Sequence, residues 1–229
     1  MKNSSQVILA LDFNDMASTV EMINLTKEHI GIYKLGLEFY LAHGKSGVKE
    51  IQSRFSGIEI FLDLKLHDIP NTVAGACRSV ADLNPKFLTV HASGGSKMIS
   101  AASSTLPKVE ITAVTILTSL DKEQMVAMGL NENIENLTLS LAKNAVNSGA
   151  RAIVSSPQEV SLLRKHLGEK VTLITPGVRP SGAERDDQER VMTPQEAIEA
   201  GADFVVIGRP ITKASDPKQA AEAITASLR

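Results

Sequence analysis

Short apolar runs rich in β-branched residues recur along the whole chain and alternate with amphipathic segments. Apolar runs of this length, bounded by turn residues, are typical of strands with both faces buried. Strands that alternate with helices predict a parallel sheet. The runs are QVILALD (6–12), IYKLGLEF (32–39), EIFLDLKL (59–66), FLTVHA (87–92), EITAVTILTS (110–119), RAIVSS (151–156), VTLITPGV (171–178) and FVVIGRPI (204–211).

The number of repeats distinguishes between the parallel architectures. Eight strand–helix units within 229 residues predict an α/β fold, a single eight-stranded parallel (β/α)8 TIM barrel. A doubly wound open sheet is the alternative. Because no linker, low-complexity segment or long run of one charge sign divides the chain, we expect one domain over residues 1–229.

Helix signals fall between the apolar runs. Asn14 or Asp15 can cap the first helix, and Pro70 suits the first turn of the helix after the third run. The sequence TPQE at 193–196 predicts a capping box with proline at the first helical position. We expect the segment AEAITASL to form the last helix.

Composition excludes several classes of function. A net charge of −2, no basic stripe, 3% aromatic residues and no tryptophan argue against nucleic-acid binding. The N-terminal apolar run is short and ends at Asp12, so we expect no signal peptide. No uncharged apolar stretch is long enough to span a membrane. The single Cys77 cannot form an internal disulfide, which favours a cytoplasmic protein with Cys77 buried in a helix.

Polar residues gather where the predicted strands end. A TIM barrel carries its functional site at this end of the strands. Any one such residue is more often a helix cap or a structural side chain, but seven of the eight strands share the pattern, which indicates a site. The residues are Asp12, Lys34, Asp63, Lys65, Asp68, His91, Thr118 and Ser119, together with the motifs TPGVR and IGRP after the last two strands.

The third strand and its neighbour predict a charged cluster. Asp63 and Lys65 share one face of a strand because side chains alternate with period two, and Lys34 lies on the adjacent strand. Buried charges are unfavourable unless paired, and opposite charges keep each other ionised. A metal site is the rival use of strand-end carboxylates. The two lysines argue against it, since an ammonium has no lone pair for a cation.

The last two strands predict a phosphate site. Many barrels bind phosphate with the loops after strands seven and eight, which here contain Gly177 with Arg179 and Gly208 with Arg209. Glycine lets backbone N–H groups approach an oxyanion, and arginine offers a planar pair of donors. Surface salt bridges are the other use of these arginines.

The polar stretch RPSGAERDDQER (179–190) is too long for a tight connection. It is either a disordered loop or a functional lid. A lid is favoured because the stretch leaves the C-terminal end of a strand. Gln188 would then add a hydrogen bond to a bound phosphate when the lid closes.

The chain resembles the orotidine 5'-monophosphate decarboxylases of the bacterial type. The motifs ALDF, YKLG, DLKLHDIPNT, TVHASGG, LTS, TPGVR and VVIGRPI carry the resemblance, in order, from residue 9 to residue 211. Asp-x-Lys-x-x-Asp alone also occurs in related sugar-phosphate barrels. The longer motif DLKLHDIPNT together with Lys34 is far more specific.

The resemblance implies decarboxylation of orotidylate to uridylate in pyrimidine biosynthesis, without metal or organic cofactor. It implies a network of Lys34, Asp63, Lys65 and Asp68, in which Lys65 stabilises and protonates a C6 carbanion. Asp68 would come from the other subunit of a homodimer, with Thr72 reaching across the same interface. The other implied contacts are Asp12 with the ribose, Thr118 and Ser119 near the pyrimidine, and Arg179, Gln188, Gly208 and Arg209 with the phosphate.

Two other functions stay open. A metal-dependent sugar-phosphate aldolase or decarboxylase would share the Asp-x-Lys-x-x-Asp pattern, but it would carry an acidic metal ligand where this chain has Lys34. A non-catalytic binder of phosphate ligands is also compatible with the fold. Binding alone does not require a lysine held between carboxylates.

Overall fold

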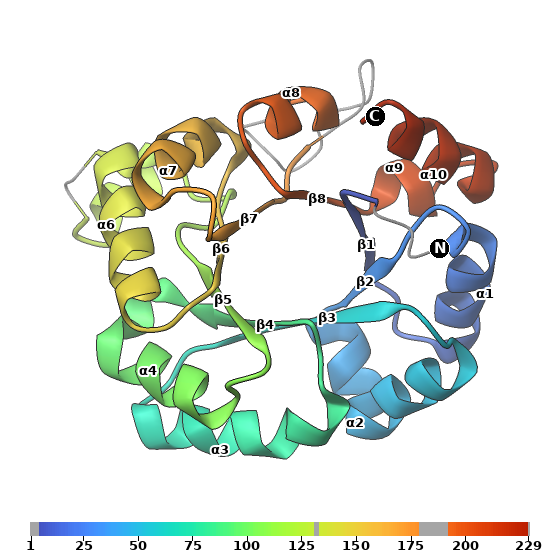
Figure 1. Cartoon of the computed structure of the whole chain (residues 1–229), viewed down its shortest axis with the longest axis horizontal. Coiled ribbons are helices and arrows are strands. Elements are labelled where there is room, and N and C mark those ends of the chain that lie inside the picture. Colours follow the sequence, from blue (N-terminus) through green and yellow to red (C-terminus); the bar gives the residue numbers. More distant parts are fainter. Residues whose placement is uncertain (1–4, 131–132, 179–191, 229) are drawn as a thin grey trace.

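The computed structural model describes residues 5–130, 133–178 and 192–228. Parallel strands form a closed barrel in sequence order, with β1 paired to both β2 and β8 (Figure 1). Closure confirms the predicted TIM barrel and excludes the open sheet. The strands are β1 (Val7–Leu11), β2 (Ile32–Leu35), β3 (Glu59–Leu66), β4 (Phe87–His91), β5 (Glu110–Val114), β6 (Ala152–Val154), β7 (Thr172–Thr175) and β8 (Phe204–Ile207).

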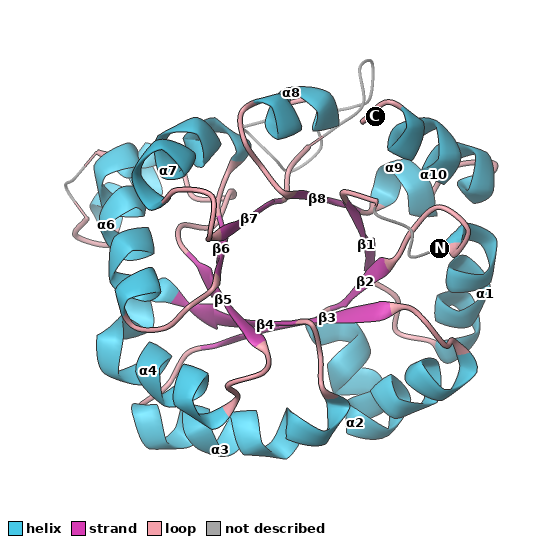
Figure 2. Cartoon of the chain, in the orientation of Figure 1, coloured by secondary structure: helices cyan, strands magenta, loops and turns pink. Residues whose placement is uncertain are grey.

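Helices form an outer ring around the barrel, as Figure 2 shows. Two helices, α5 and α6, lie between β5 and β6, and two more follow β8. None of the helices in the described ranges is long and apolar enough to cross a membrane. They are α1 (Met16–Thr26), α2 (Leu37–Arg54), α3 (Pro70–Val80), α4 (Gly95–Thr105), α5 (Lys122–Ala127), α6 (Ile134–Asn147), α7 (Val160–Leu167), α8 (Pro194–Glu199), α9 (Arg209–Thr212) and α10 (Pro217–Ala226).

Several predicted strands extend too far at their C-terminal ends. β2 ends at Leu35 instead of residue 39, because Gly36 is the N-cap of α2 and Phe39 is a buried residue of that helix. β5 ends at Val114 instead of residue 119, and β8 ends at Ile207 before α9 begins. The apolar pattern continues past these ends partly because residues such as Phe39 and Ile211 in the following helices are buried.

The helix-start signals are confirmed. Asp15, and not Asn14, caps α1 by accepting a 2.7 Å hydrogen bond from the Ser18 N–H. Pro70 is the first residue of α3. At α8 the Thr193 hydroxyl accepts from the Glu196 N–H at 3.2 Å, and the Glu196 carboxylate accepts from the Thr193 N–H at 2.8 Å. These local signals fix where helices begin after the strands.

Two apolar layers hold the barrel together. Side chains inside it include Ile8 and Phe61, and the rings of Phe61 and Phe87 meet edge-on with centroids 5.5 Å apart. A larger layer fills the space between strands and helices and includes Leu62 and Cys77. Cys77 is buried in α3 as predicted, and burial raises the pKa of its thiol to about 11. The thiol is therefore protonated at neutral pH, and Cys77 acts as a packing residue.

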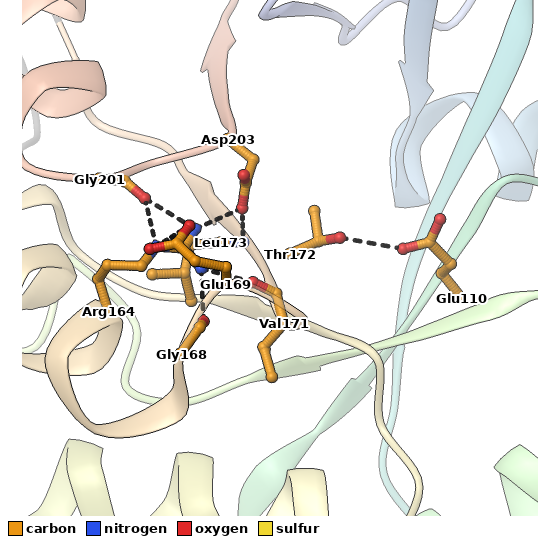
Figure 3. Close-up of polar contacts among 9 residues, drawn as sticks. All are labelled: Glu110, Arg164, Gly168, Glu169, Val171, Thr172, Leu173, Gly201 and Asp203. Carbon is orange, nitrogen blue, oxygen red and sulfur yellow. Dashed lines mark hydrogen bonds and ion pairs between the residues drawn. The ribbon is translucent and has the colours of Figure 1, made fainter.

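A partly buried arginine, Arg164, connects the N-terminal ends of the last strands (Figure 3). Arg164 of α7 donates hydrogen bonds to the carbonyls of Gly168 and Gly201 and to the Asp203 carboxylate, at 2.6–3.0 Å. The same carboxylate accepts a 2.7 Å bond from the Leu173 N–H. This network lies at the end of the barrel associated with stability, which leaves the other end for the site.

Candidate active site

A cavity of about 280 Å³ opens at the C-terminal end of the barrel. Its lining combines ionisable side chains with apolar ones and with glycine-containing loops. This mixture suits a ligand that has a planar or apolar part and an anionic part. The lining includes Asp12, Lys34, Asp63, Lys65, Thr118, Ser155, Gly177, Gly208 and Arg209.

Asp63 lies between two ammonium groups. The Lys65 Nζ is 2.9 and 2.8 Å from the two oxygens of the Asp63 carboxylate. The Lys34 Nζ is 3.5 Å from Asp63 Oδ2 and 3.1 Å from Asp12 Oδ1. Asp63 is only 7% exposed, so its charge depends on these partners. The structure therefore brings together the cluster that the sequence predicts within one chain.

The pKa values of the cluster follow from burial and pairing. Burial disfavours the ionised form of Asp63, but the neighbouring charges of Lys34 and Lys65 outweigh it and hold the pKa of Asp63 below its ordinary value. Burial likewise disfavours the Lys34 ammonium, yet Asp63 and Asp12 raise the pKa of Lys34. Both groups are therefore charged at neutral pH.

The backbone that carries Lys65 is not a regular strand. In the β3–β4 ladder, Leu62 pairs with Leu88 and Leu66 pairs with Val90, so β3 contains a bulge. Lys65 has a φ of 48°, in the left-handed region. The expectation that strand alternation alone places Lys65 beside Asp63 is therefore wrong, although their side chains do meet. The bulge supplies the close approach.

A buried hydroxyl, which the sequence did not indicate, connects Asp63 and Lys65. Thr89 of β4 donates a 2.9 Å hydrogen bond to Asp63 Oδ1 and accepts a 2.8 Å bond from the Lys65 N–H. The available signal was a polar residue inside the apolar run 87–92, next to the third strand. An alternating pattern alone does not show that such a residue points toward the cluster.

The glycine loops of the predicted phosphate site lie at the same end of the barrel. Gly177, Gly208 and Arg209 line the cavity. Gly177 has a φ of 81°, which favours glycine. Arg179 and Gln188, and with them the predicted lid, lie outside the described residues. Three of the five residues predicted for the phosphate site are thus at the cavity.

Comparison with protein families matches residues 5–224 to the "Orotidine 5'-phosphate decarboxylase / HUMPS family". The chain belongs to this family. It is 49% identical to an orotidine 5'-phosphate decarboxylase of Thermobifida fusca (strain YX), over 99% of this chain and 97% of that protein. It is 46% identical to one of Anaeromyxobacter sp. (strain K), over the full length of both.

Solved structures show the same relationship. The crystal structure of an orotidine 5'-phosphate decarboxylase from Lactobacillus acidophilus matches with a TM-score of 0.85 and 36% identity, over 98% of this chain and 99% of that one. An uncharacterized conserved protein from Geobacillus kaustophilus matches with a TM-score of 0.83 and 28% identity, over 97% and 100%. Both sequence and fold place the chain in the decarboxylase/HUMPS family.

In this family member, three predicted site residues lie apart from the cavity of their own chain. Asp68, Thr72 and Ser119 are exposed and are not among the described residues that line it. The Asp68 carboxylate accepts a 2.6 Å hydrogen bond from the Ile69 N–H at the start of α3. Thr118, next to Ser119, does line the cavity. A role for Asp68 and Thr72 in another subunit stays a prediction.

One further lining residue of this family member, Ser155, has no counterpart in the sequence predictions, whereas His91 is one of the predicted strand-end residues. Ser155, after β6, lines the cavity, and its buried hydroxyl has no hydrogen-bond partner in the part of the chain that the structure describes. Near the charged cluster, the rings of His91 and His67 lie 5.3 Å apart. Burial lowers the pKa of His91, and the charges of His67 and Lys65 lower it further. The Asp63 carboxylate acts in the opposite direction but does not outweigh them.

Proposed function

We propose that this protein is an orotidine 5'-phosphate decarboxylase, which converts orotidylate into uridylate and carbon dioxide in pyrimidine biosynthesis. The observation that carries the proposal is the Asp63 carboxylate held between the Lys34 and Lys65 ammonium groups in the barrel cavity. Full-length relatives that bear this name support it. The reaction uses no metal and no organic cofactor.

Lys65 is the central group of the proposed mechanism. When the bond between C6 and the carboxylate carbon breaks, its electron pair stays on C6 of the pyrimidine. No adjacent carbonyl delocalises that pair as an enolate. A fixed ammonium stabilises it, and Lys65 then delivers a proton to C6. A charge pair about 4 Å apart contributes roughly 4 kcal/mol at an effective dielectric constant of about 20. Each 1.4 kcal/mol or so is about tenfold in rate.

Asp63 holds the Lys65 ammonium in place and lies near the departing carboxylate in this mechanism. The two short contacts to both carboxylate oxygens restrict the lysine side chain, which is 31% exposed. Lys34 keeps Asp63 ionised from the other side. A preorganised set of charges acts without reorganisation at the moment of reaction.

The remaining predicted residues bind the rest of the nucleotide. Asp12 binds the ribose, and Thr118 and Ser119 lie near the pyrimidine. The phosphate is remote from the reacting carbon, but its binding energy lowers the barrier if it orders the site. The phosphate-binding residues in this proposal are Arg179, Gln188, Gly208 and Arg209.

The proposed active form is a cytoplasmic homodimer. Asp68, just before α3, and Thr72, in its first turn, are exposed and do not line their own chain's cavity. In the dimer each would complete the neighbouring site, so that Asp68 extends the alternating series of Lys34, Asp63 and Lys65. This arrangement gives an exposed carboxylate directly after β3 a catalytic use.

A metal-dependent aldolase or decarboxylase of sugar phosphates is the alternative. Lys34 argues against it, because its ammonium contacts both Asp12 and Asp63 and would repel a cation bound to either. The deciding experiment is an ultraviolet assay with orotidylate, with and without a chelator. We expect turnover that the chelator does not change. Loss of that turnover on chelation, with magnesium-dependent turnover of a pentulose or hexulose phosphate, would favour the alternative.

A further inference from the structure

At the bulge in β3, three residues of β3 lie opposite a single residue of β4. Between the pairs Leu62–Leu88 and Leu66–Val90, β3 contains residues 63–65 and β4 contains only Thr89. The Lys65 N–H, which a regular ladder would pair with a backbone carbonyl, instead donates to the Thr89 hydroxyl at 2.8 Å. A side chain therefore replaces the backbone at this point of the ladder.

The conformation of Lys65 needs such support. Its φ of 48° lies in the left-handed region, which is unfavourable for a residue with a Cβ. Asn84 is the other non-glycine residue with positive φ in the described ranges, and asparagine tolerates this region well. Strained conformations of this kind persist only where the surrounding structure holds them. The hydrogen bond that the Thr89 hydroxyl accepts from the Lys65 N–H is one such constraint.

The Thr89 hydroxyl has a single proton, and its hydrogen-bond partners show where that proton points. It gives that proton to Asp63 Oδ1 at 2.9 Å and accepts from the Lys65 N–H with a lone pair. Successive hydrogen bonds of this kind polarise one another. Thr89 is fully buried, and its branched Cβ restricts rotation, so the oxygen is fixed between the two residues.

We infer that Thr89 is a positioning residue for the decarboxylation, because one buried hydroxyl fixes both the Asp63 carboxylate and the backbone that carries Lys65. The inference rests on the proposed function. Asp63 Oδ1 accepts from both Thr89 and the Lys65 ammonium, so rotation of the carboxylate would move the ammonium away from C6. A displacement of about 1 Å can slow a reaction about a hundredfold.

Replacement of Thr89 by valine tests this role. Thr89→Val keeps the branched shape and removes the hydroxyl. We expect kcat for orotidylate to fall at least about thirtyfold while KM changes less than about threefold, since phosphate binding is untouched. We expect Thr89→Ser to regain kcat to within about fivefold of wild type. The acid limb of the kcat profile should move to higher pH in Thr89→Val, because Asp63 loses a hydrogen bond to its ionised form.

Thr26→Val is the matched control. Thr26 is also fully buried with two hydrogen bonds, to the Met22 carbonyl and the Tyr33 hydroxyl, but it lies on α1. We expect it to lose stability without losing kcat. If Thr89→Val does not fold, Thr89→Ala provides the same comparison with less crowding, and we expect the same separation of kcat from KM.

The outcomes separate the two proposals. A kcat within twofold of wild type in Thr89→Val or Thr89→Ala, or a loss in Thr89→Ser as large as in those variants, would overturn the positioning role. In that case the wild type would still decarboxylate orotidylate and Lys65→Ala would not. Absence of orotidylate turnover in the wild type would instead overturn the proposed function, and the positioning role with it.

Discussion

Asp63 connects the charged residues of the cavity, because it contacts both lysine ammonium groups and the Thr89 hydroxyl. Its ionisation therefore depends on folding. In the unfolded chain an aspartate has a pKa near 3.9, whereas Lys34 and Lys65 hold the folded-state pKa of Asp63 lower against the effect of burial. A lowered pKa contributes stability above about pH 4 that is lost as the pH falls through the folded-state value.

The first prediction follows from the lowered pKa of Asp63. The difference in free energy of unfolding between wild type and Asp63→Asn should be constant from about pH 5 to about pH 9 and should shift against the wild type below about pH 4. Urea denaturation at a series of pH values measures it. Lys34, whose pKa is raised, limits the window at the other end, since its contribution is lost as the pH rises through its folded-state pKa. A difference that stays constant down to about pH 2 would contradict the assigned pairing.

His91 gives a second prediction at this scale. Burial, His67 and Lys65 together lower its pKa despite Asp63, so the folded state resists protonation. Its contribution to stability is present above about pH 6.5 and is lost as the pH falls through the folded-state pKa. Between about pH 7.5 and 5.5 the wild type should therefore lose more stability than His91→Gln. The exposed His166→Gln on α7 is the control and should follow the wild type.

At the scale of the elements, the presence and order of the strands could be predicted better than the residues at which they end. Apolar runs separated by amphipathic segments indicated all eight strands, and β3 has the predicted bounds. The C-terminal ends were too long at β2, β5 and β8. Burial determines much of the apolar pattern, and some residues just beyond the strand ends, such as Phe39 and Ile211, are buried as well. Sequence pattern therefore does not separate the two.

The candidate site could be predicted as a set of residues but not as a geometry. The sequence indicated Lys34, Asp63 and Lys65, because charges at strand ends of a barrel need partners. It did not indicate Thr89 or the bulge, since a register shift between β3 and β4 depends on two strands at once. Ser155 was missed for a different reason, because a serine at a strand end can have many structural roles.

The network of Arg164 gives a prediction for the opposite end of the barrel. Arg164→Ala should lower the free energy of unfolding by about 2–4 kcal/mol, because the carbonyls of Gly168, Val171 and Gly201 and the Asp203 carboxylate lose their donor. It should leave kcat unchanged. Arg54→Ala is the control, since the Arg54–Glu50 pair is exposed and contributes about 0.5 kcal/mol or less. A fall in kcat equal to that of a cavity variant would show that the two ends are coupled.

At the scale of the whole molecule, the proposed dimer makes each site depend on two chains. Mixing inactive Lys65→Ala chains with inactive Asp68→Ala chains should restore activity, because some mixed dimers contain one site with both wild-type residues. At full exchange of equal amounts, up to about a quarter of the sites should be of this kind. Recovery is measured by orotidylate turnover after subunit exchange has been shown. No recovery would contradict the shared site.

The central claim is that the Lys65 ammonium, held by Asp63 in the barrel cavity, performs the decarboxylation. The direct measurement is kcat/KM for orotidylate in Lys65→Ala beside the wild type and Lys143→Ala, an exposed lysine on α6. We predict a loss of at least about 10⁴-fold for Lys65→Ala, as expected when a general acid and a charge stabiliser are removed together. Lys143→Ala should stay within about twofold. Near-normal turnover by Lys65→Ala would contradict the account.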